Sequence, residues 1–438
     1  MQSLSQARVI TSSALSQRIT DTAINPANCE GPDGAQRASA PPLRARRKGL
    51  ILGEKGSSLG TTAKCSATPP KIDLETGEIT GGEFAYSKAA AQAQRFALQS
   101  VARSLQPNSR LAKCLRWRQG GQQVQVLKSI KHQSASYSGL QTCGSVWVCA
   151  VCAAKIAERR RGEIAKAIAA HEALGGFVLL LTLTAPHQRE NNLVELLEQQ
   201  ATALKFFNKD RSARNVFKEM GCIGQIRALE VTHGRLSEQN NGYHPHYHIL
   251  LFVGLGGVSV HPDEAQRKDW AVRLYLRWSA CCERAGLGTP SYAYGLKLDD
   301  GSKAAAYASK WGLEDEMTKG HTKKAIHGET PFDLLRAILA DASDKQAAAL
   351  FIEFAEAFKG KRQLYWSTGL KKRYGIGEAS DEELAAKVED HSFVLGSITT
   401  DQWRDVLRVE GRAIVLQLAV NWGWEAVTFY LDSIKKNE

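Results

Sequence analysis

The sequence predicts an α+β fold in which helices flank an antiparallel sheet, and three observations carry this prediction. Residues 176–186 (GFVLLLTLTAP) are a continuous apolar run with β-branched residues, which is typical of a buried strand that ends at a proline. Residues 224–234 and 243–254 are two more strand patterns around a polar loop with Asn-Asn-Gly, which indicates a hairpin. Residues 191–207 and 268–286 carry apolar side chains at helical spacing and supply the flanking helices.

Composition divides the chain into four predicted regions. Residues 1–85 are rich in Ser, Thr, Ala, Gly, Pro and Arg and lack periodicity, which predicts a disordered leader. Residues 86–170 hold a helix and a cysteine-rich segment for which we expect zinc binding and DNA contact. Residues 171–330 contain the predicted catalytic domain, and residues 331–438 are mostly helical.

Charge and cysteine content narrow the class of protein. The 438 residues carry a net charge of +12 and a pI of about 9.2, which favours a nucleic-acid partner over a membrane. The alternative is a basic protein with solvated lysines. No segment reaches the roughly eighteen apolar residues of a membrane helix, and the first residues lack a signal-peptide pattern. We therefore expect a cytoplasmic protein, in which nine cysteines are metal ligands or buried thiols rather than disulfides.

Three histidines alternate along the second strand of the predicted hairpin. Because residues two apart share a strand face, His246 and His248 can converge on one metal ion. His244 shares their parity, but Pro245 follows it, so His244 is expected at or before the strand start. Glu230 on the partner strand can face the histidines and supply a carboxylate ligand. The alternative is that the histidines are polar residues on a solvent-exposed face.

A tyrosine surrounded by small residues lies in KAAAYASKW, within a predicted short helix at 302–312. Lys303 and Lys310 fall on the same helix face as Tyr307, where positive charge favours a phenolate and can hold a phosphate. Tyr307 is therefore a candidate covalent nucleophile. The alternative is a packed tyrosine beside two lysines that extend to solvent.

Three cysteines within ten residues predict a structural zinc site. Cys149 and Cys152 form a C-x-x-C pair, Cys143 precedes them, and Cys114 is the candidate fourth ligand. Four thiolates leave no open position for water, so such a site would be structural. The alternative is a set of buried thiols. Elsewhere, Cys281 and Cys282 fall on the apolar face of the 268–286 helix and are expected to be core thiols.

Two basic segments are candidates for DNA contact. The predicted helix after the cysteines carries Arg159, Arg160 and Arg161, which could hold a DNA backbone or simply form a solvated helix face. Residues 359–375 (KGKRQLYWSTGLKKRYG) combine aromatics, which can stack on bases, with basic residues. The alternative is that Tyr365 and Trp366 pack the C-terminal helices on the core. The proposed DNA contacts in this segment are Lys361, Arg362, Trp366, Lys371 and Lys372.

Three of these motifs occur in the order found in the HUH endonucleases. They are LLLTLT (179–184), HPHYHILLF (244–252) and YASK (307–310), and over residues 110–375 the chain resembles rolling-circle replication initiators of small bacterial plasmids. The resemblance implies a central antiparallel sheet in which the first two motifs are neighbouring strands. It also implies that His246, His248 and Glu230 hold Mg²⁺ or Mn²⁺.

The resemblance further implies a reaction and partners. Tyr307 would attack a phosphate of one strand of origin DNA, remain joined to the 5′ end and free a 3′-OH, with Lys310 orienting the phosphate. A host helicase and polymerase would then act from this end. Some relatives carry an acidic residue one helical turn before the tyrosine, where this chain has Lys303; Asp299 and Asp300 lie about two turns upstream.

Two other functions fit the same motifs. The first is a mobilisation relaxase or single-strand transposase of the same chemistry, although relaxases usually place the tyrosine before the histidines, whereas Tyr307 follows them. The second is a zinc-stabilised origin-binding protein without catalytic activity.

Overall fold

The computed structural model describes residues 71–72, 79–80, 83–238, 240–254, 261–300, 328–388 and 391–435. Contacts divide the chain into two compact units, residues 1–86 and 87–438. In the first unit, β1 (Lys71–Ile72) pairs antiparallel with β2 (Ile79–Thr80). Helix α2 (Glu83–Leu105) begins near the border, and the other elements belong to the second unit.

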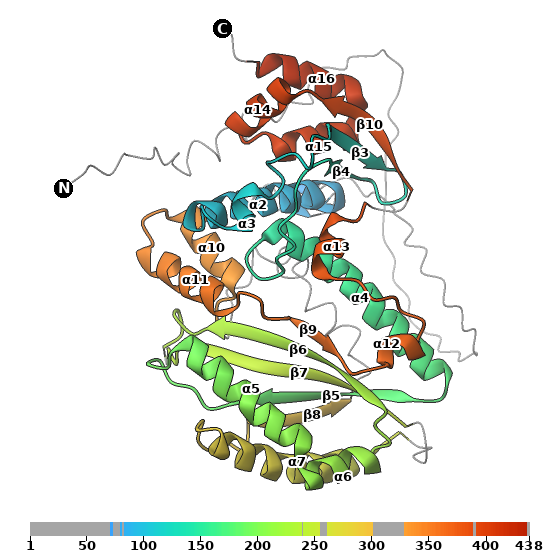
Figure 1. Ribbon diagram of the computed structural model, residues 1–438, viewed down its shortest axis with the longest axis vertical. Coiled ribbons are helices and arrows are strands. Elements are labelled where there is room, and N and C mark those ends of the chain that lie inside the picture. Colours follow the sequence, from blue (N-terminus) through green and yellow to red (C-terminus); the bar gives the residue numbers. More distant parts are fainter. Residues whose placement is uncertain are drawn as a thin grey trace, which may run out of the picture. The chain divides into compact units, whose positions relative to one another are not determined.

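The largest sheet among the described residues is five-stranded and antiparallel (Figure 1). Its strands are β5 (Phe177–Thr184), β6 (Gly224–His233), β7 (Tyr243–Val253), β8 (Leu296–Asp300) and β9 (Leu364–Trp366), in the order β8-β5-β7-β6-β9. Every neighbouring pair is antiparallel. The α+β class and the hairpin of residues 224–254 are therefore confirmed, whereas β8 and β9 had not been predicted.

One face of this sheet is covered by three helices, α5 (Leu193–Lys209), α6 (Arg211–Glu219) and α7 (Glu264–Arg284). Apolar side chains of β5 and β7 at odd positions, such as Leu181 and Ile249, pack into the same core as helix residues such as Phe207 and Trp278. Asn192 caps α5 by accepting from the backbone of Val194 and Glu195.

The opposite face changes character along its length. At one end, side chains of the strands pack against α4 (Ala150–Ala173) and against α12 (Leu370–Arg373) and its neighbours; the strand residues are Val178, Leu180, Ile226, Leu250 and Phe252. At the other end the same face carries polar residues, because side chains at even-numbered positions of these strands point to this face. They are Thr182, Glu230, His246 and His248. The strands thus anchor the polar end through their apolar continuation.

A second, three-stranded sheet joins distant parts of the chain. It pairs β3 (Val124–Ser129) with both β4 (Ser134–Ser138) and β10 (Ser392–Ile398). Figure 1 shows this sheet beside α14 (Thr400–Arg408), α15 (Arg412–Asn421) and α16 (Gly423–Ser433). The remaining helices of the described chain are α3 (Arg110–Lys113), α10 (Pro331–Ala340), α11 (Lys345–Ala357) and α13 (Asp381–Ala386).

The C-terminal third is mostly helical, but two of its strands complete sheets begun much earlier. β9 pairs with β6, and β10 pairs with β3. Three of the four predicted regions, 86–170, 171–330 and 331–438, are thus connected through the sheets, and the boundaries of all four remain a prediction. Among the described residues, none of the helices combines the length and apolar character needed to cross a membrane.

One expectation about the histidine strand was wrong. β7 begins at Tyr243, so His244 lies inside the strand, paired with Thr232. β5 ends at Thr184, which lies opposite His246. The side of β7 that faces β5 is therefore an unpaired edge of the described sheet at Pro245, and proline is tolerated on such an edge. The expectation for α7 is confirmed, since Cys281 and Cys282 are both buried.

Candidate metal sites

The first candidate site lies at the polar end of the five-stranded sheet. β7 supplies His246 and His248, and β6 supplies Glu230. Glu230 pairs with His246 in the strand register, and Ala228, whose side chain is small, pairs with His248. The register therefore brings the carboxylate beside both imidazoles on one face.

The distances in this group suit an octahedral cation. The Nε2 atoms of His246 and His248 lie 3.2 and 3.0 Å from the same oxygen, Oε2 of Glu230. Neighbouring ligands at about 2.1 Å from an octahedral ion are about 3.0 Å apart. The histidine side chains are only 13% and 12% exposed, so they are not polar residues on a solvent-exposed face. The group could hold a metal ion, and its three protein ligands leave coordination positions for substrate oxygens.

The second nitrogen of each imidazole is also held. His246 Nδ1 lies 3.3 Å from the backbone oxygen of His244, and His248 Nδ1 lies 3.1 Å from Oγ1 of Thr182 on β5. With a metal bound, a proton on Nδ1 would satisfy both contacts and leave Nε2 with the lone pair that binds the ion, whereas without a metal the Nε2–H groups donate to Glu230. Sequence inspection missed Thr182; its position in the strand before the histidine motif was the available signal.

Glu230 is held in its charged form. Burial by itself raises the pKa of this carboxyl, but hydrogen bonds from His246 and His248 outweigh burial and keep the pKa of Glu230 well below its usual value. A carboxylate that stays ionised is available as a hard oxygen ligand at neutral pH.

Two further histidines lie beside the site. His244 Nδ1 is 3.1 Å from Nε2 of His187, which lies in the loop after β5, and the rings of His244 and His246 are 5.0 Å apart. Burial lowers the pKa of His244 to about 3 and also lowers the pKa of His187. The pair therefore adds neutral hydrogen-bonding groups, rather than positive charge, next to the candidate ligands.

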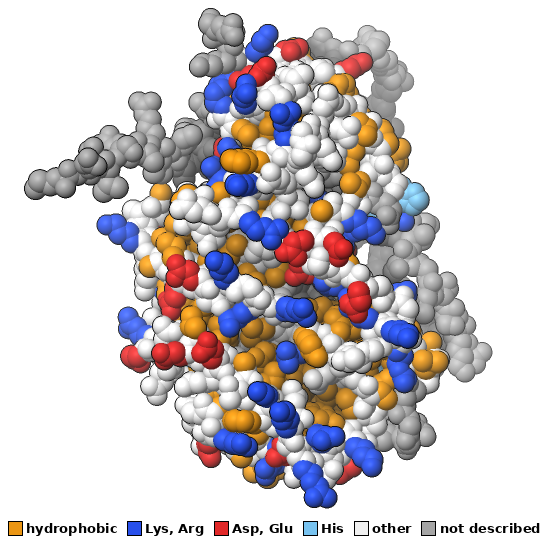
Figure 2. All heavy atoms as spheres, viewed as in Figure 1, with side chains coloured by type: hydrophobic (Ala, Val, Ile, Leu, Met, Phe, Trp, Pro, Cys, Tyr) orange, Lys and Arg blue, Asp and Glu red, His pale blue; other side chains and the backbone are white. Residues whose placement is uncertain are grey.

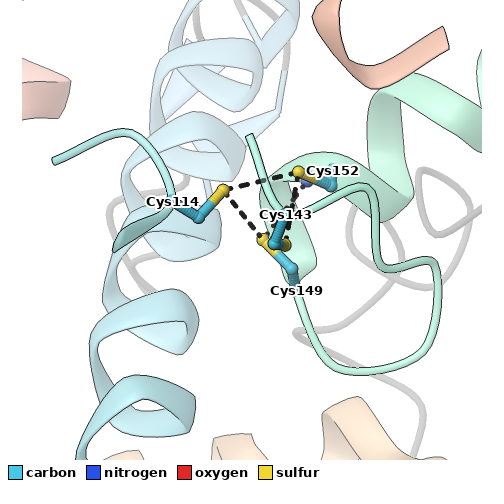
Figure 3. Close-up of side chains that lie close together, drawn as sticks. All are labelled: Cys114, Cys143, Cys149 and Cys152. Carbon is cyan, nitrogen blue, oxygen red and sulfur yellow. Dashed lines mark hydrogen bonds between the residues drawn. The ribbon is translucent and has the colours of Figure 1, made fainter. Parts of the chain in front are cut away.

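The second candidate site gathers the four predicted cysteines. Cys114 follows α3, Cys143 and Cys149 lie in the loop before α4, and Cys152 lies in its first turn. Figure 3 shows Cys114 approaching from one side and the other three sulfurs from the opposite side. All four side chains are buried. The group could hold a metal ion.

The sulfur separations fit a tetrahedral centre. Cys114 Sγ lies 3.8 Å from Cys149 Sγ and 3.5 Å from Cys152 Sγ, and Cys143 Sγ lies 3.7 Å from Cys152 Sγ. Four ligands at about 2.3 Å from a tetrahedral zinc ion are about 3.8 Å apart. Hydrogen bonds among the thiols, together with burial, raise the pKa of Cys143 above its usual value; at Cys149 they outweigh burial and lower the pKa, so a cation would be needed to hold all four sulfurs as thiolates.

The three consecutive arginines of α4 have different surroundings. Arg160 is 16% exposed and pairs with Glu163 and Asp381. Arg159 donates to the backbone oxygen of Lys387, and Arg161 pairs with Glu158 on the exposed helix surface. Contact with DNA stays a prediction for all three, and for Arg160 it would have to compete with two ion pairs.

The aromatic residues of the downstream segment do not share one surface. Tyr365 and Trp366 are consecutive in β9, so they point to opposite sides of the sheet. Tyr365 is exposed and lies against Arg227, with the guanidinium 4.9 Å from the ring centre. Trp366 packs against the apolar end of the sheet, where Lys371 Nζ lies 5.5 Å from its ring centre.

The basic residues of that segment also differ in exposure. Lys371 is 5% exposed and lies near Glu163 and Glu378. Arg362 and Lys372 are exposed, and Lys361 is half-buried. Arg362 precedes Gln363, whose backbone oxygen accepts from Leu229, next to Glu230. Figure 2 shows Lys and Arg side chains scattered over the visible face among acidic and apolar ones. These DNA contacts also stay a prediction.

The predicted nucleophile lies outside the described residues, as do Lys303 and Lys310. The described part of β8 ends at Asp300, seven positions before Tyr307 in the sequence. Asp299 and Asp300 are both half-buried, and Asp299 pairs with Lys297 at 2.9 Å.

Comparisons with known proteins bear on the resemblance. Protein rep of Streptomyces lividans is 26% identical over 62% of this chain and 73% of that protein. The chain is similar to a Rep protein. The predicted resemblance to Rep-type replication initiators is thereby confirmed. The neomycin resistance protein of Streptomyces cyanogenus is 29% identical over 26% of the chain and 31% of its own length. No family model and no solved structure matches the chain, so its similarity to Rep rests on sequence.

Proposed function

We propose that the chain initiates plasmid replication by nicking one strand of origin DNA, through an HUH-type mechanism in which Tyr307 becomes joined to the 5′ end. The observation that carries this proposal is the convergence of His246, His248 and Glu230 at the polar end of an antiparallel sheet. The similarity to Rep supports the biological role.

The candidate ligands have the chemistry that a phosphate reaction needs. A bound Mg²⁺ or Mn²⁺ would withdraw charge from the phosphate oxygens. His246, His248 and Glu230 would hold such a cation, and three protein ligands would leave coordination positions for DNA oxygens. Thr182 fixes the orientation of His248, and the neutral pair His187–His244 adds no positive charge that would repel the cation.

The proposed covalent step is balanced within the DNA and the tyrosine. The Tyr307 phenolate oxygen forms a bond to the scissile phosphorus, and the bond from phosphorus to the 3′ oxygen breaks. The released oxygen takes a proton and becomes the 3′-OH from which a host polymerase extends. Attack of a 3′-OH on the phosphotyrosine reverses the step, so rejoining needs no ATP. We propose that Lys310 orients the phosphate. Because Lys303 is not acidic, Asp299 or Asp300 is the candidate for the acidic residue that acts when replication terminates.

A nicking assay tests the proposal. Supercoiled plasmid with the cognate origin is incubated with Mn²⁺ and either wild type or Tyr307→Phe, with Tyr294→Phe as the matched control. Tyr294 is 79% exposed and lies before β8 in the same domain. We expect wild type and Tyr294→Phe to relax the plasmid and form a 5′-linked adduct, and Tyr307→Phe to do neither.

The other outcomes separate the remaining functions. Nicking by Tyr307→Phe at the wild-type rate would remove the nucleophile assignment. Origin binding without any nicking by wild type would favour a non-catalytic origin-binding protein. Cleavage at a transposon end or a transfer origin, but not at a replication origin, would favour a transposase or relaxase.

A further inference from the structure

A buried arginine is connected to the cysteine group through the side chain of one other residue. Arg412, the first residue of α15, is 1% exposed although it carries a charge. Its Nη1 donates to Oε1 of Gln99 at 2.7 Å, and Gln99 Nε2 donates to Cys149 Sγ at 3.2 Å. Gln99 belongs to α2 and is also 1% exposed. Two hydrogen bonds thus connect the cysteine group to the C-terminal helices.

Arg412 fixes which end of the Gln99 amide faces the sulfur. A guanidinium has only donors, so it requires the amide oxygen of Gln99, and the amide NH₂ must then face Cys149. The backbone N–H of Cys152 also points at Cys149 Sγ, at 3.5 Å. Two donors directed at one sulfur are suited to a thiolate, which can only accept.

The described surroundings of Arg412 contain more positive than negative charge. The Glu410 carboxylate accepts from Arg412 at 3.0 Å and lies 2.8 Å from Arg116 and 3.4 Å from Arg103. Three guanidiniums against one carboxylate leave an excess of two positive charges. Arg412 is the buried member of this group, and its charge is costly there unless other groups balance it. Four thiolates with one divalent cation carry a net charge of minus two, which equals the excess.

We propose that Arg412, together with Arg103 and Arg116, provides the counter-charge of a four-thiolate centre that holds a divalent cation, and that Gln99 connects this charge to Cys149. Gln99 and Arg412 are then positioning residues of the centre. The C-terminal segment at residues 410–412 completes the metal site although none of its residues is a ligand. The proposal does not depend on the nicking activity, since it concerns the cysteine group alone.

The Gln99→Glu variant separates this role from a purely structural one. A carboxylate in place of the amide still accepts from Arg412, so it preserves or strengthens the contact that holds α2 to α15. It cannot donate to Cys149, and it places negative charge beside a thiolate. We expect the variant to fold, with a circular dichroism spectrum like that of wild type, and to bind Zn²⁺ about 10–100-fold more weakly in competition with a chromogenic chelator.

A second variant and a matched control complete the test. Arg412→Met removes the counter-charge and should weaken Zn²⁺ binding by a similar factor, whereas Arg408→Met removes an arginine from the exposed surface of α14 and should not. Metal analysis of the purified wild type should give one tightly bound divalent ion per chain besides any Mg²⁺ or Mn²⁺ at His246, His248 and Glu230, and its identity distinguishes zinc from iron. A folded Gln99→Glu variant that retains Zn²⁺ as tightly as wild type would overturn the proposal. Wild type that holds no divalent ion, with four thiols that react freely, would also overturn it.

Discussion

A residue without metal-binding chemistry can control a metal site, and Thr182 is an example. Its hydroxyl oxygen lies 3.1 Å from His248 Nδ1, so it holds the ring in the orientation that turns Nε2 toward Glu230. Such outer contacts typically change metal affinity by about 10–100-fold when they are removed.

We therefore expect Thr182→Val to weaken Mn²⁺ binding by about 10–100-fold and to slow nicking, because valine keeps the volume but cannot accept from Nδ1. Titration calorimetry with Mn²⁺ measures the affinity. Thr202→Val is the control, since Thr202 lies on the exposed surface of α5 and its hydroxyl donates to the Glu198 backbone oxygen of the same helix. Equal Mn²⁺ affinity in wild type and Thr182→Val would show that the contact does not position His248.

His171 gives a pH dependence of stability. Its Nε2 contacts the backbone oxygen of Val253 at 2.8 Å, and its Nδ1 contacts the hydroxyl of Tyr374 at 2.8 Å. Carbonyls accept, so Nε2 carries the proton and Nδ1 accepts from Tyr374 in the neutral ring. Burial lowers the pKa of His171 below its ordinary value of about 6.5, although the carbonyl contacts act in the opposite sense.

The sign of this effect follows from the lowered pKa. Above about pH 6.5 the ring is neutral in both the folded and the unfolded chain. Below about pH 6.5 the unfolded chain binds the proton more readily than the folded chain, so the folding stability decreases as the pH is lowered. We expect wild type to lose more stability than His171→Gln between pH 7.5 and pH 5, as measured by urea unfolding. Parallel losses in the two proteins would exclude His171 as the cause.

Individual candidate ligands could be predicted, but the residues that support them could not. His246 and His248 are two positions apart, and Cys149 and Cys152 are three apart, so spacing alone brings each pair together. Gln99 and Arg412 are 313 positions apart. Their contact depends on the packing of α2 against α15, which no local pattern in the sequence encodes.

Among the elements, the junction of α4 and β5 depends on close approach at a glycine. A Cβ on Gly176 would lie 2.4 Å from the His171 ring, which is held on both sides by hydrogen bonds. A Cβ on Gly162, in the exposed middle of α4, would meet none of the described atoms within 4 Å.

Substitution by alanine should change the folding stability in opposite directions at these two glycines. Gly176→Ala should destabilise the protein by about 1–3 kcal/mol, because the ring must move and loses its partners. Gly162→Ala should stabilise it by about 0.5–1 kcal/mol, because alanine restricts the unfolded chain and favours the helix. Urea unfolding of both variants measures the difference, and a shift of the same sign in both would contradict the packing at Gly176.

Long amphipathic elements were predictable, whereas short strands were not. The hairpin, the first buried strand and α7 carry clear apolar patterns over eight or more residues. β9 has three residues within a basic segment, and β10 pairs with a strand from the other end of the unit. Their strand conformation is imposed by the neighbouring edges of β6 and β3, so it appears only once the fold is known.

At the scale of the whole unit, the cysteine group is part of the main core. The four cysteines belong to the same apolar cluster as residues of α2, the five-stranded sheet and α5. A metal centre there would join segments that are distant in sequence. Its loss should therefore affect the stability of the unit and not only the loop that carries the ligands.

We expect Cys114→Ser to lower the melting temperature and to leave the protein without its tightly bound metal, because three sulfurs no longer complete the tetrahedron. Excess chelator under reducing conditions should lower the melting temperature of wild type but not of this variant. Cys222→Ser is the control, since Cys222 lies outside the group and its hydrogen bond to the Gly224 backbone oxygen can be made by serine. Equal melting of Cys114→Ser and wild type would argue against a structural metal.

The arrangement of β10 also has a consequence for synthesis. β3 and β4 leave the ribosome early, but the partner of the outer edge of β3 is made only when residues 392–398 appear. At ordinary rates of translation this takes roughly 15 to 50 s. During that time the unpaired edge of β3 can attract other chains. Arg412 emerges later still, so the cysteine group acquires its counter-charge long after its own residues are made, and slow or interrupted translation would favour aggregation over a completed metal centre.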